Sequence, residues 1–417
     1  MKARDGVSIV IPSWNGRHLL ERFLPSIIGA AEQCLRKSVS AVEVIVVDDG
    51  STDGTVEWLS GQAFIEADDS RSAPPIAAPN RDAPNRDAPT RDAPTRDAPT
   101  RDAPAGHGAG GLPSVDIHEQ GPMPQTNGAA PEPKFWFIRN ANNLGFGRSC
   151  NKGFAQAHYP LVMLVNNDVE LGSDCLSALL ENFADAATFA AHCKTVDLRS
   201  GEECGTGKLG AFSKGFIRVH QSYIPRAPLA ESKAGPLYSM FATGGSAMFD
   251  RAKFLELGGF DELLAPFYWE DVEVSYRAWK RGYRIVYEPR AIARHQISST
   301  IGRLNAGQVR RVQQRNRLLF HWINLHDRRM LASHLLWVFL LALSAPFRLQ
   351  PGFCVALGHA LRSLPSVRPR RRQEKLASKL SDRQIFEIFR NLAEREDVIA
   401  YDHLSELTGH TARGVSA

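Results

Sequence analysis

Short apolar segments alternate with helix-length segments along the first 165 residues. Four apolar runs have the length and composition of buried strands, at 8–12, 43–47, 135–139 and 161–165. Helices are predicted between and beside them, at 19–35, 54–59 and 147–158. Apolar strands joined by helices favour a parallel sheet that is covered by helices on both faces. The sequence therefore predicts an α/β fold whose ligands bind at the carboxyl ends of the strands.

A low-complexity segment, 66–132, interrupts this alternation. Between Pro79 and Ala103 a pentapeptide occurs five times, first as Pro-Asn-Arg-Asp-Ala and then as Pro-Thr-Arg-Asp-Ala. Proline at every fifth position removes backbone donors, arginine and aspartate cancel in charge, and no side chain larger than alanine can be buried. A short solenoid is the alternative, but a period of five offers it no core. We therefore predict a disordered insertion.

The chain concentrates its positive charge near the C-terminus. Residues 301–372 contain 13 arginines and one acid, Asp327, whereas the whole chain has a net charge of +5. Such a segment is typical of proteins that bind nucleic acid or an anionic membrane surface. Two apolar stretches within it, 330–347 and 353–364, favour the membrane, and the second is followed by the arginine-rich stretch 368–372. We therefore expect a membrane partner and no nucleic acid.

The first apolar stretch, 330–347, is of borderline length for a membrane span. As a helix it would be about 27 Å long, just short of the roughly 30 Å hydrocarbon core. Whether it crosses the bilayer stays open, and a pair of core helices packed on the rest of the protein is the alternative. The six cysteines form no Cys-x-x-Cys pair, and no secretory signal precedes the first strand. We expect a cytoplasmic protein, peripheral to or shallowly inserted in the inner face of the cell membrane.

Polar motifs begin where the second and fourth predicted strands end. Asp48 and Asp49 follow the second strand, where they could contact a base or ribose, and the alternative is a turn in which Asp53 caps the next helix. Asn166 and Asp168 follow the fourth strand with side chains expected on the same side, because side chains along a strand alternate. A hard cation such as Mg²⁺ needs only one or two carboxylates beside phosphate oxygens. An Asx turn is the alternative at this second motif.

An acidic helix start follows three aromatic residues at 267–269. Glu270 and Asp271 lie in the predicted first turn, where the helix dipole favours anions, and aromatic neighbours can raise a carboxylate pKa toward that of a general base. Gly244 and Gly245 upstream suit close approach of a ligand, although glycine pairs also form turns. His295 follows an apolar strand-like segment, and it could bind a metal beside a diphosphate held by Arg294, Ser298 and Ser299.

Together these motifs resemble the family-2 glycosyltransferases, especially the bacterial rhamnosyltransferase-like members. The resemblance covers residues 7–59 and 135 to about 317. It rests on the segments 7–16, 46–55, 142–154, 166–169, 244–249 and 269–277, followed by His295. It implies an A-type glycosyltransferase fold, which is a Rossmann-like, mostly parallel sheet with helices on both faces. It also implies a nucleotide-diphosphate sugar donor, Mg²⁺ or Mn²⁺, and inversion at the anomeric carbon.

The resemblance also implies roles for individual residues. Asp271 matches the catalytic base, Asp168 the metal-binding acid, and His295 a metal-binding histidine of some members. The donor site is expected to contain Pro12, Trp14, Asn15, Asp48, Asp49, Asn143, Gly145, Asn166 and Asn167. The surroundings of the acceptor or diphosphate are expected to contain Gly244, Gly245, Trp269, Glu270 and Arg294.

Two positions depart from the family pattern. The first acid of the metal motif is replaced by Asn166, which weakens the expectation of strict metal dependence. The tryptophan of the Gln-x-x-Arg-Trp motif of processive synthases is replaced by Leu318, after Gln314 and Arg317. We therefore predict that one or a few sugars are added, rather than a long chain.

Four parts of the chain are expected from this pattern. They are a nucleotide-binding half at 1–65, the insertion at 66–132, a metal, donor and acceptor part at 133–320, and a helical, membrane-associating C-terminal region at 321–417. The predicted function is transfer of a sugar from dTDP-rhamnose or a UDP-sugar to a glycan or polyprenyl-linked acceptor in cell-surface polysaccharide synthesis.

Two other functions remain alternatives. A non-catalytic sugar-nucleotide-binding protein at a membrane would not need both Asp168 and Asp271 for turnover. A sugar-1-phosphate nucleotidyltransferase would be expected to have a glycine-rich, basic phosphate loop after the first strand, and residues 12–17 are a poor one.

Overall fold

The computed structural model describes residues 6–62, 64–67, 132–219, 221–226, 235–296, 305–345 and 351–401. All of them belong to one of the two units into which the chain divides, residues 1–76 with 131–417. The pentapeptide repeat, Ser298, Ser299 and residues 402–417 lie outside the described residues. The predictions for those segments are therefore not tested.

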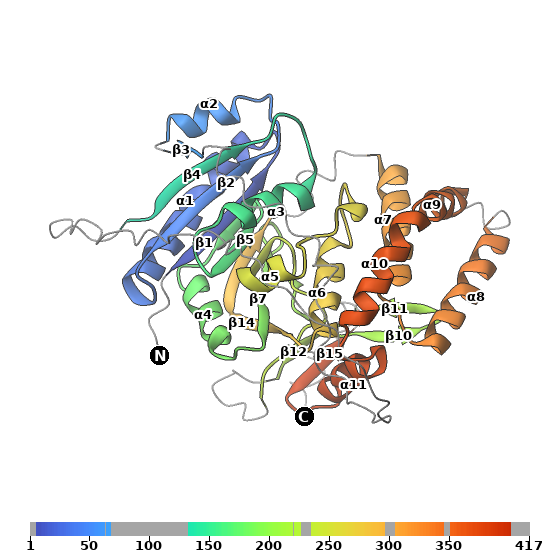
Figure 1. The fold of residues 1–417 in the computed structure, drawn as a ribbon. Helices are drawn as coiled ribbons and strands as arrows, with labels where there is room; N and C mark the ends of the chain where they lie inside the picture. The colour runs from blue at the N-terminus through green and yellow to red at the C-terminus, as the bar shows by residue number, and fades with distance from the viewer. Residues whose placement is uncertain are drawn as a thin grey trace, which may run out of the picture. The chain divides into compact units, whose positions relative to one another are not determined.

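A ten-stranded sheet forms the centre of the described unit, in the order β3-β4-β2-β1-β5-β13-β7-β14-β6, with β8 paired to β7 (Figure 1). Neighbouring strands from β3 to β5 are parallel, and so are β7 and β14, whereas β13 and β6 run antiparallel to their neighbours. The prediction of a mostly parallel sheet is confirmed. The strands are β1 (Val7–Ser13), β2 (Val42–Asp48), β3 (Ile65–Glu66), β4 (Lys134–Arg139), β5 (Leu161–Val165), β6 (Val169–Leu171), β7 (Thr188–Asp197), β8 (Glu203–Gly205), β13 (Ser246–Asp250) and β14 (Arg284–His295).

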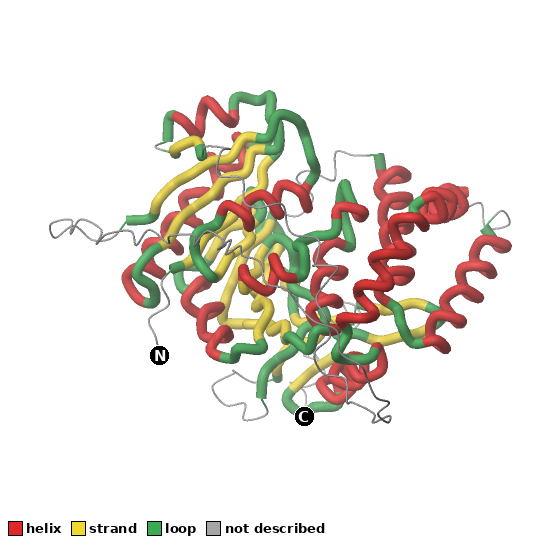
Figure 2. The backbone as a smooth tube through the Cα atoms, viewed as in Figure 1, coloured by secondary structure: helices red, strands yellow, loops and turns green. Residues whose placement is uncertain are grey.

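Helices cover both faces of this sheet (Figure 2). Side chains along β1 alternate between two cores: Ile9 and Ile11 face the core that includes α1 and α4, and Val10 faces the core that includes α3, α5 and α6. All three are fully buried, which explains why this strand is apolar throughout. The helices are α1 (Arg17–Lys37), α2 (Thr55–Ser60), α3 (Phe146–Gln156), α4 (Cys175–Glu181), α5 (Arg251–Glu256) and α6 (Glu270–Lys280).

The order of the strands reverses between β1 and β5. The chain passes outward from β1 to β2 and β4, and then returns through α3 to β5 on the other side of β1. Connections on the two sides of such a point diverge, and open α/β sheets commonly bind ligands there, at the carboxyl ends of the strands. The loops after β1, β2, β4 and β5 therefore meet at this edge of the sheet.

The C-terminal region is mostly helical and packs beside α6. Its elements are α7 (Ala306–Asn324), α8 (Arg328–Ser344), α9 (Pro351–Arg362), α10 (Leu364–Ala377), α11 (Asp382–Ala393) and β15 (Val398–Tyr401). A buried ion pair attaches α11 to α6, with 2.6 Å between Lys280 Nζ and Asp382 Oδ1. Tyr276 of α6 donates a hydrogen bond to the same aspartate.

Short elements link the C-terminal region to the rest of the unit. The strand β15 pairs with β12, which pairs with β9. The hairpin β10-β11 contacts α8 through the hydrogen bond from His334 to Gly215 O. Among the described residues, no helix combines the length and the apolar character that crossing a membrane requires. The remaining elements are β9 (Gly207–Lys208), β10 (Ala211–Ser213), β11 (Phe216–Arg218), β12 (Ser222–Pro225) and the 3-10 helices Asn182–Ala184 and Glu262–Leu264.

Candidate active site

The loops after β1 and β2 are joined through Asn15. Its backbone N–H donates to Ser51 Oγ at 2.8 Å, and its side-chain Oδ1 accepts from the backbone N–H of Thr52 at 2.8 Å. The predicted donor-binding asparagine is therefore already engaged by protein groups and holds the two loops together. Trp14, beside it, exposes 43% of its surface, so its indole is accessible to a ligand, and Pro12 is the second-last residue of β1.

Asp49 shapes the loop that follows β4. Its carboxylate accepts hydrogen bonds from Asn140 Nδ2 at 3.0 Å and from the backbone N–H groups of Leu144 and Gly145 at 2.8 and 2.9 Å. Asn143 lies on this loop with an exposed side chain. The predicted ribose contact thus has its oxygens turned toward the loop that carries two other predicted donor residues.

Asp48 is fully buried at the end of β2. Its Oδ2 accepts from the backbone N–H of Ser51 at 3.2 Å, while Oδ1 has no hydrogen-bond partner among the described residues. A buried carboxylate oxygen without a donor is costly, and ligand hydroxyl groups or water commonly satisfy such an atom.

Glycines let the loops of the site approach one another. Gly145 has φ of 87°, and a Cβ atom there would lie 3.4 Å from the carbonyl oxygen of Pro266, so the loop after β4 touches the segment that leads to α6. A Cβ atom on Gly245 would lie 2.5 Å from Asn166 Nδ2, and one on Gly244 would lie 3.6 Å from Asp271 Cβ. The glycine pair therefore fills the narrow space between the motif after β5 and the start of α6.

The motif after β5 is held from two sides. Asn167 Nδ2 donates to Ser13 Oγ at 2.9 Å, and the backbone N–H of Asn166 donates to Gly245 O at 3.0 Å. Asn166 Oδ1 is buried and has no hydrogen-bond partner among the described residues. This amide oxygen is chemically suited to a cation or to a ligand hydroxyl group.

Asp168 and His295 face each other at the edge of the sheet. Asp168 Oδ1 lies 3.1 Å from His295 Nε2, and the two residues come from the β5-β6 turn and the end of β14. This is the distance of a direct ion pair, and a carboxylate oxygen and an imidazole nitrogen are also groups that could hold a divalent ion beside the phosphate oxygens of a ligand. No group of three His, Cys, Asp or Glu residues forms a metal site within the described part of the chain. The remaining ligands would come from the donor phosphates and water.

Asp271 lies at the start of α6, close to Gly244. Its Oδ2 accepts from the backbone N–H of Gly244 at 3.4 Å and its Oδ1 from that of Val272 at 2.8 Å. Burial raises the pKa of Asp271 above its usual value. Burial, and next the charge of Asp271, raise the pKa of Glu270 to about 8. At neutral pH the pair therefore carries less negative charge than two ordinary carboxylates.

Sequence reasoning missed Asn316, which supports the segment before α6. Tyr268 and Trp269 have φ of 69° and 77°, the left-handed region that side chains disfavour. Asn316 of α7 is fully buried, and its Nδ2 donates to the carbonyl oxygens of Leu264, Phe267 and Tyr268. This amide thereby fixes the strained segment from which Asp271 projects.

Two predicted residues lie differently from the rest. Trp269 packs its indole against Phe320, 5.3 Å between ring centroids, so it supports the site from within the protein. Arg294 pairs with Glu170 at 2.9 Å, and neighbours along a strand point to opposite faces, so it does not share the face of His295. The other predicted residues lie at or just after the ends of strands or at the start of α6 and in the loops beside it.

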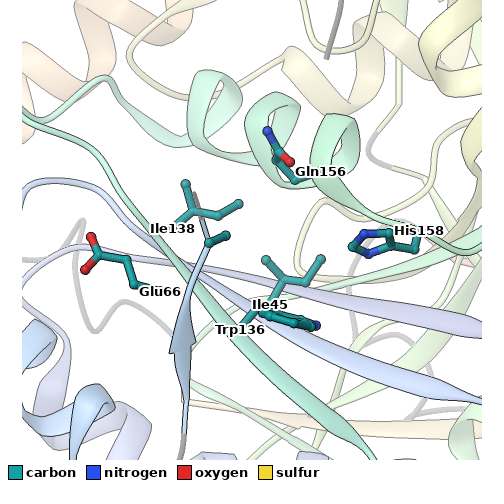
Figure 3. Close-up of a pocket in the computed structure, with 7 residues that line it drawn as sticks. Ile45, Glu66, Trp136, Ile138, Gln156 and His158 are labelled. Carbon is teal, nitrogen blue, oxygen red and sulfur yellow. The ribbon is translucent and has the colours of Figure 1, made fainter. Parts of the chain in front are cut away.

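A separate cavity of about 180 Å³ lies against the sheet face near the end of α3. Figure 3 shows Trp136, Ile138 and Ile45 from the strands facing Gln156 and His158 across it. None of its lining residues belongs to the predicted site. The cavity is therefore distinct from the candidate active site.

Comparisons with known proteins identify the family. The model "Glycosyl transferase family 2" matches residues 8–69, and the model "Glycosyl transferase family group 2" matches residues 161–367. A curated relative, the poly-beta-1,6-N-acetyl-D-glucosamine synthase of Staphylococcus aureus, is 26% identical over 179 residues, which are 43% of this chain and 40% of the relative. This match thus spans well under half of the relative's length.

Solved structures match with TM-scores below 0.5 and at low identity. GalNAc-T7 with UDP, GalNAc and Mn²⁺ matches with a TM-score of 0.49 and 14% identity, over 88% of this chain and 58% of that one. TarS 1–349 of S. aureus with UDP-GlcNAc matches with a TM-score of 0.45 and 14% identity, over 93% and 92% of the two chains.

The two matched ranges include β1, β2 and β5, the Asp168–His295 pair and the segment that carries Asp271. The sheet has the mostly parallel, helix-covered form that the resemblance implied. The chain belongs to the family-2 glycosyltransferases and has their A-type fold.

Proposed function

We propose that this glycosyltransferase inverts the anomeric carbon as it moves a sugar from a nucleotide-diphosphate donor to an acceptor hydroxyl group. The proposed donors are dTDP-rhamnose and UDP-sugars, and the proposed acceptor is a glycan or polyprenyl-linked glycan of a cell-surface polysaccharide. The observation that carries the proposal is the hydrogen-bonded path between the two halves of the site. The backbone N–H of Asn166 donates to Gly245 O, and the backbone N–H of Gly244 donates to Asp271 Oδ2. The glycine pair therefore links the proposed metal motif to the proposed base through hydrogen bonds.

A divalent ion, Mg²⁺ or Mn²⁺, is proposed between Asp168 and His295. When bound, it would stabilise the negative charge that develops on the departing nucleotide diphosphate. The 3.1 Å separation of the two side chains and their donor types support this site. Asn166 contributes a neutral oxygen where the family pattern has a second acid, so we expect a weaker ion site.

Asp271 is proposed to take the proton from the acceptor hydroxyl group. The acceptor oxygen then forms its bond to the anomeric carbon as the bond from that carbon to the diphosphate oxygen breaks, and the proton ends on the Asp271 carboxylate. Burial raises the pKa of Asp271, which makes it a stronger base than an exposed aspartate. The hydrogen bonds from the Gly244 and Val272 N–H groups fix the orientation of the Asp271 carboxylate. Because Glu270 is largely protonated at neutral pH, no second full negative charge lies beside Asp271.

We propose that the enzyme adds one or a few sugars per acceptor. The proposal is supported by Leu318, which stands where processive synthases carry a tryptophan after Gln314 and Arg317. Product length on a defined acceptor, followed by mass spectrometry, tests it. A ladder of many added sugars from single enzyme–acceptor encounters would refute it.

The central test compares Asp271→Asn with Glu262→Gln. A panel of dTDP- and UDP-sugars identifies the donor by hydrolysis and by thermal protection with and without Mn²⁺. Asp271→Asn should lower turnover by at least about 100-fold and leave nucleotide affinity within about threefold. Glu262, an exposed carboxylate on the preceding 3-10 helix, is the matched control, and Glu262→Gln should keep activity. Normal turnover by Asp271→Asn would refute the assigned base.

The ion site has its own test. Chelation should abolish turnover and Mn²⁺ should restore it, while Asp168→Ala should raise the Mn²⁺ concentration needed for half-maximal rate. Asn166→Asp, which supplies a second acid, should lower that concentration. Equal Mn²⁺ dependence in all three proteins would refute the site.

A further inference from the structure

The helix α8 exposes an entirely apolar face. Leu335, Leu336, Phe339, Leu340 and Leu343 leave 52, 57, 62, 42 and 60% of their surface uncovered. With exposed Ala332 they follow one another at helical spacing, so they form one continuous stripe, here called the outward face of α8. A helix on a protein surface normally turns charged or polar residues to this side. Figure 1 shows α8 at the margin of the described unit, on the side away from the sheet.

The opposite face of α8 is fixed to the catalytic part. His334 Nδ1 donates to Gly215 O at 2.8 Å, and its ring stacks on that of His321 at 4.6 Å between centroids. Gly215, in the β10-β11 turn, leaves room for Trp337, because a Cβ atom there would lie 2.7 Å from Trp337 Cβ. Rotating α8 to hide its outward face would break these contacts. These contacts therefore orient α8 so that the apolar stripe faces outward.

Exposed positive charge lies on α8, α9 and α10, and these side chains are here called the cationic rim. Arg328 and Arg329 begin α8, and Arg362, Arg368, Arg372 and Lys375 lie exposed on α9 and α10. The described residues of α7 to α10 and of the segments between these helices contain two acids. Both already form ion pairs, Asp327 with Arg383 and buried Glu374 with Arg281. The helix α9 adds two exposed apolar side chains, Val355 and Leu361. The region thus combines an apolar surface with an uncompensated cationic rim.

We propose that α8 and α9 dock this protein onto an anionic phospholipid bilayer, with α8 lying along the interface. The outward face would enter the boundary between headgroups and acyl chains, and the arginines would contact the phosphates. A second copy of this chain fits the same face less well, because a twofold contact would place two cationic rims against each other. The proposal concerns binding alone and does not depend on the transfer reaction.

Vesicle flotation tests the proposal with the full chain. We expect the protein to float with vesicles of phosphatidylglycerol and phosphatidylcholine, more weakly with phosphatidylcholine alone, and less as salt is raised. The double variant Leu336→Glu/Phe339→Glu should lose at least about tenfold in vesicle partitioning, since two exposed apolar side chains are replaced by anions. Ile65→Glu is the matched control: Ile65 is 59% exposed on the edge strand β3, and its variant should bind like the parent protein.

A second variant tests the cationic rim. Arg362→Glu/Arg368→Glu should reduce binding to the phosphatidylglycerol vesicles and leave the weaker binding to phosphatidylcholine unchanged. Unaltered melting temperatures confirm folding of every variant, and donor hydrolysis is followed separately so that a failure of the proposed reaction is not confused with a failure to bind.

Three outcomes would overturn the proposal. The parent protein does not float, or the α8 double variant floats as well as the parent. Alternatively, light scattering shows a dimer that the α8 substitutions dissociate, while vesicles are not bound, which would assign the face to a second copy.

Discussion

Replacing Asn316 should slow the chemical step while leaving donor binding nearly intact. In Asn316→Ala the three carbonyl oxygens that accept from Nδ2 lose their donor inside the protein. One unsatisfied buried acceptor costs about 1–3 kcal/mol, and each left-handed residue that the amide holds, Tyr268 and Trp269, stores about 1–3 kcal/mol. The segment can relieve this cost by moving, and Asp271 would move with it.

The expected loss follows from these magnitudes. If about 1.4–2.8 kcal/mol of the cost appears in the transition state, the turnover number falls about 10- to 100-fold. The proposed donor contacts at Trp14, Asp48 and the loop after β4 do not involve Asn316, so the donor dissociation constant should change by less than about threefold. Initial rates at saturating donor and calorimetric titration of the nucleotide measure the two quantities.

Two further variants make the reasoning falsifiable. Asn316→Asp keeps the shape but cannot donate to the carbonyl groups, so it should be as slow as Asn316→Ala. Asn324→Ala is the matched control, because Asn324 is equally buried on α7 but donates to Glu273 and Phe320 O instead. It should lower the melting temperature with little effect on turnover. Parent-like turnover in Asn316→Ala, or an equal loss in Asn324→Ala, would refute the positioning role.

Three other predictions concern stability and pH. The pKa of Glu270 is about 8 in the folded protein, against an ordinary value of 4.5. The folded protein therefore binds this proton more tightly than the unfolded chain, and the free energy of unfolding should fall as the pH rises from 4.5 to about 8. Glu270→Gln should make the melting temperature less dependent on pH in this range. Asp382→Ala should cost about 3–5 kcal/mol in urea unfolding because Lys280 stays buried without its partner, and Lys280→Met/Asp382→Leu should recover most of the loss. Burial lowers the pKa of His334 to about 4, below its ordinary 6.5, so the unfolded chain takes up a proton first and stability falls as pH drops through this window. The protection factors of the α8 amides, which are exchange rates corrected for the pH-dependent intrinsic rate, should then fall from pH 6.5 to about 4. Protection factors at about pH 5 equal to those at pH 6.5 would contradict this expectation.

The first half of the sheet could be predicted from the sequence because its signals are local. The predicted strands correspond to β1, β2, β4 and β5, whose apolar residues are buried on both faces. In the second half only part of β14 could be predicted, as the apolar strand-like segment before His295. The strand β7 is buried largely through Ala190, Ala191, His192 and Cys193, and β13 follows a glycine pair that suggests a turn. Such segments become strands through pairing with distant neighbours, which no local pattern reveals.

The site was predictable to the extent that its residues follow strands. The facing pair Asp168 and His295, and the position of Asp271 at a helix start, agree with the sequence analysis. Asn316 carried no signal, since it lies among arginines on α7 and gains its role only when the fold brings residues 264–268 beside it. Asp49 shows the same limit, because its hydrogen bonds to the loop after β4 depend on tertiary structure.

The attachment of α11 to α6 has a consequence for biosynthesis. Tyr276, on the helix that carries the base, and Asp382 are 106 residues apart in the chain. Ribosomes add about 5–20 residues per second, so α6 emerges roughly 5–20 s before the aspartate that neutralises its buried ammonium group. During translation α6 therefore lacks these two contacts until the segment around Asp382 has emerged.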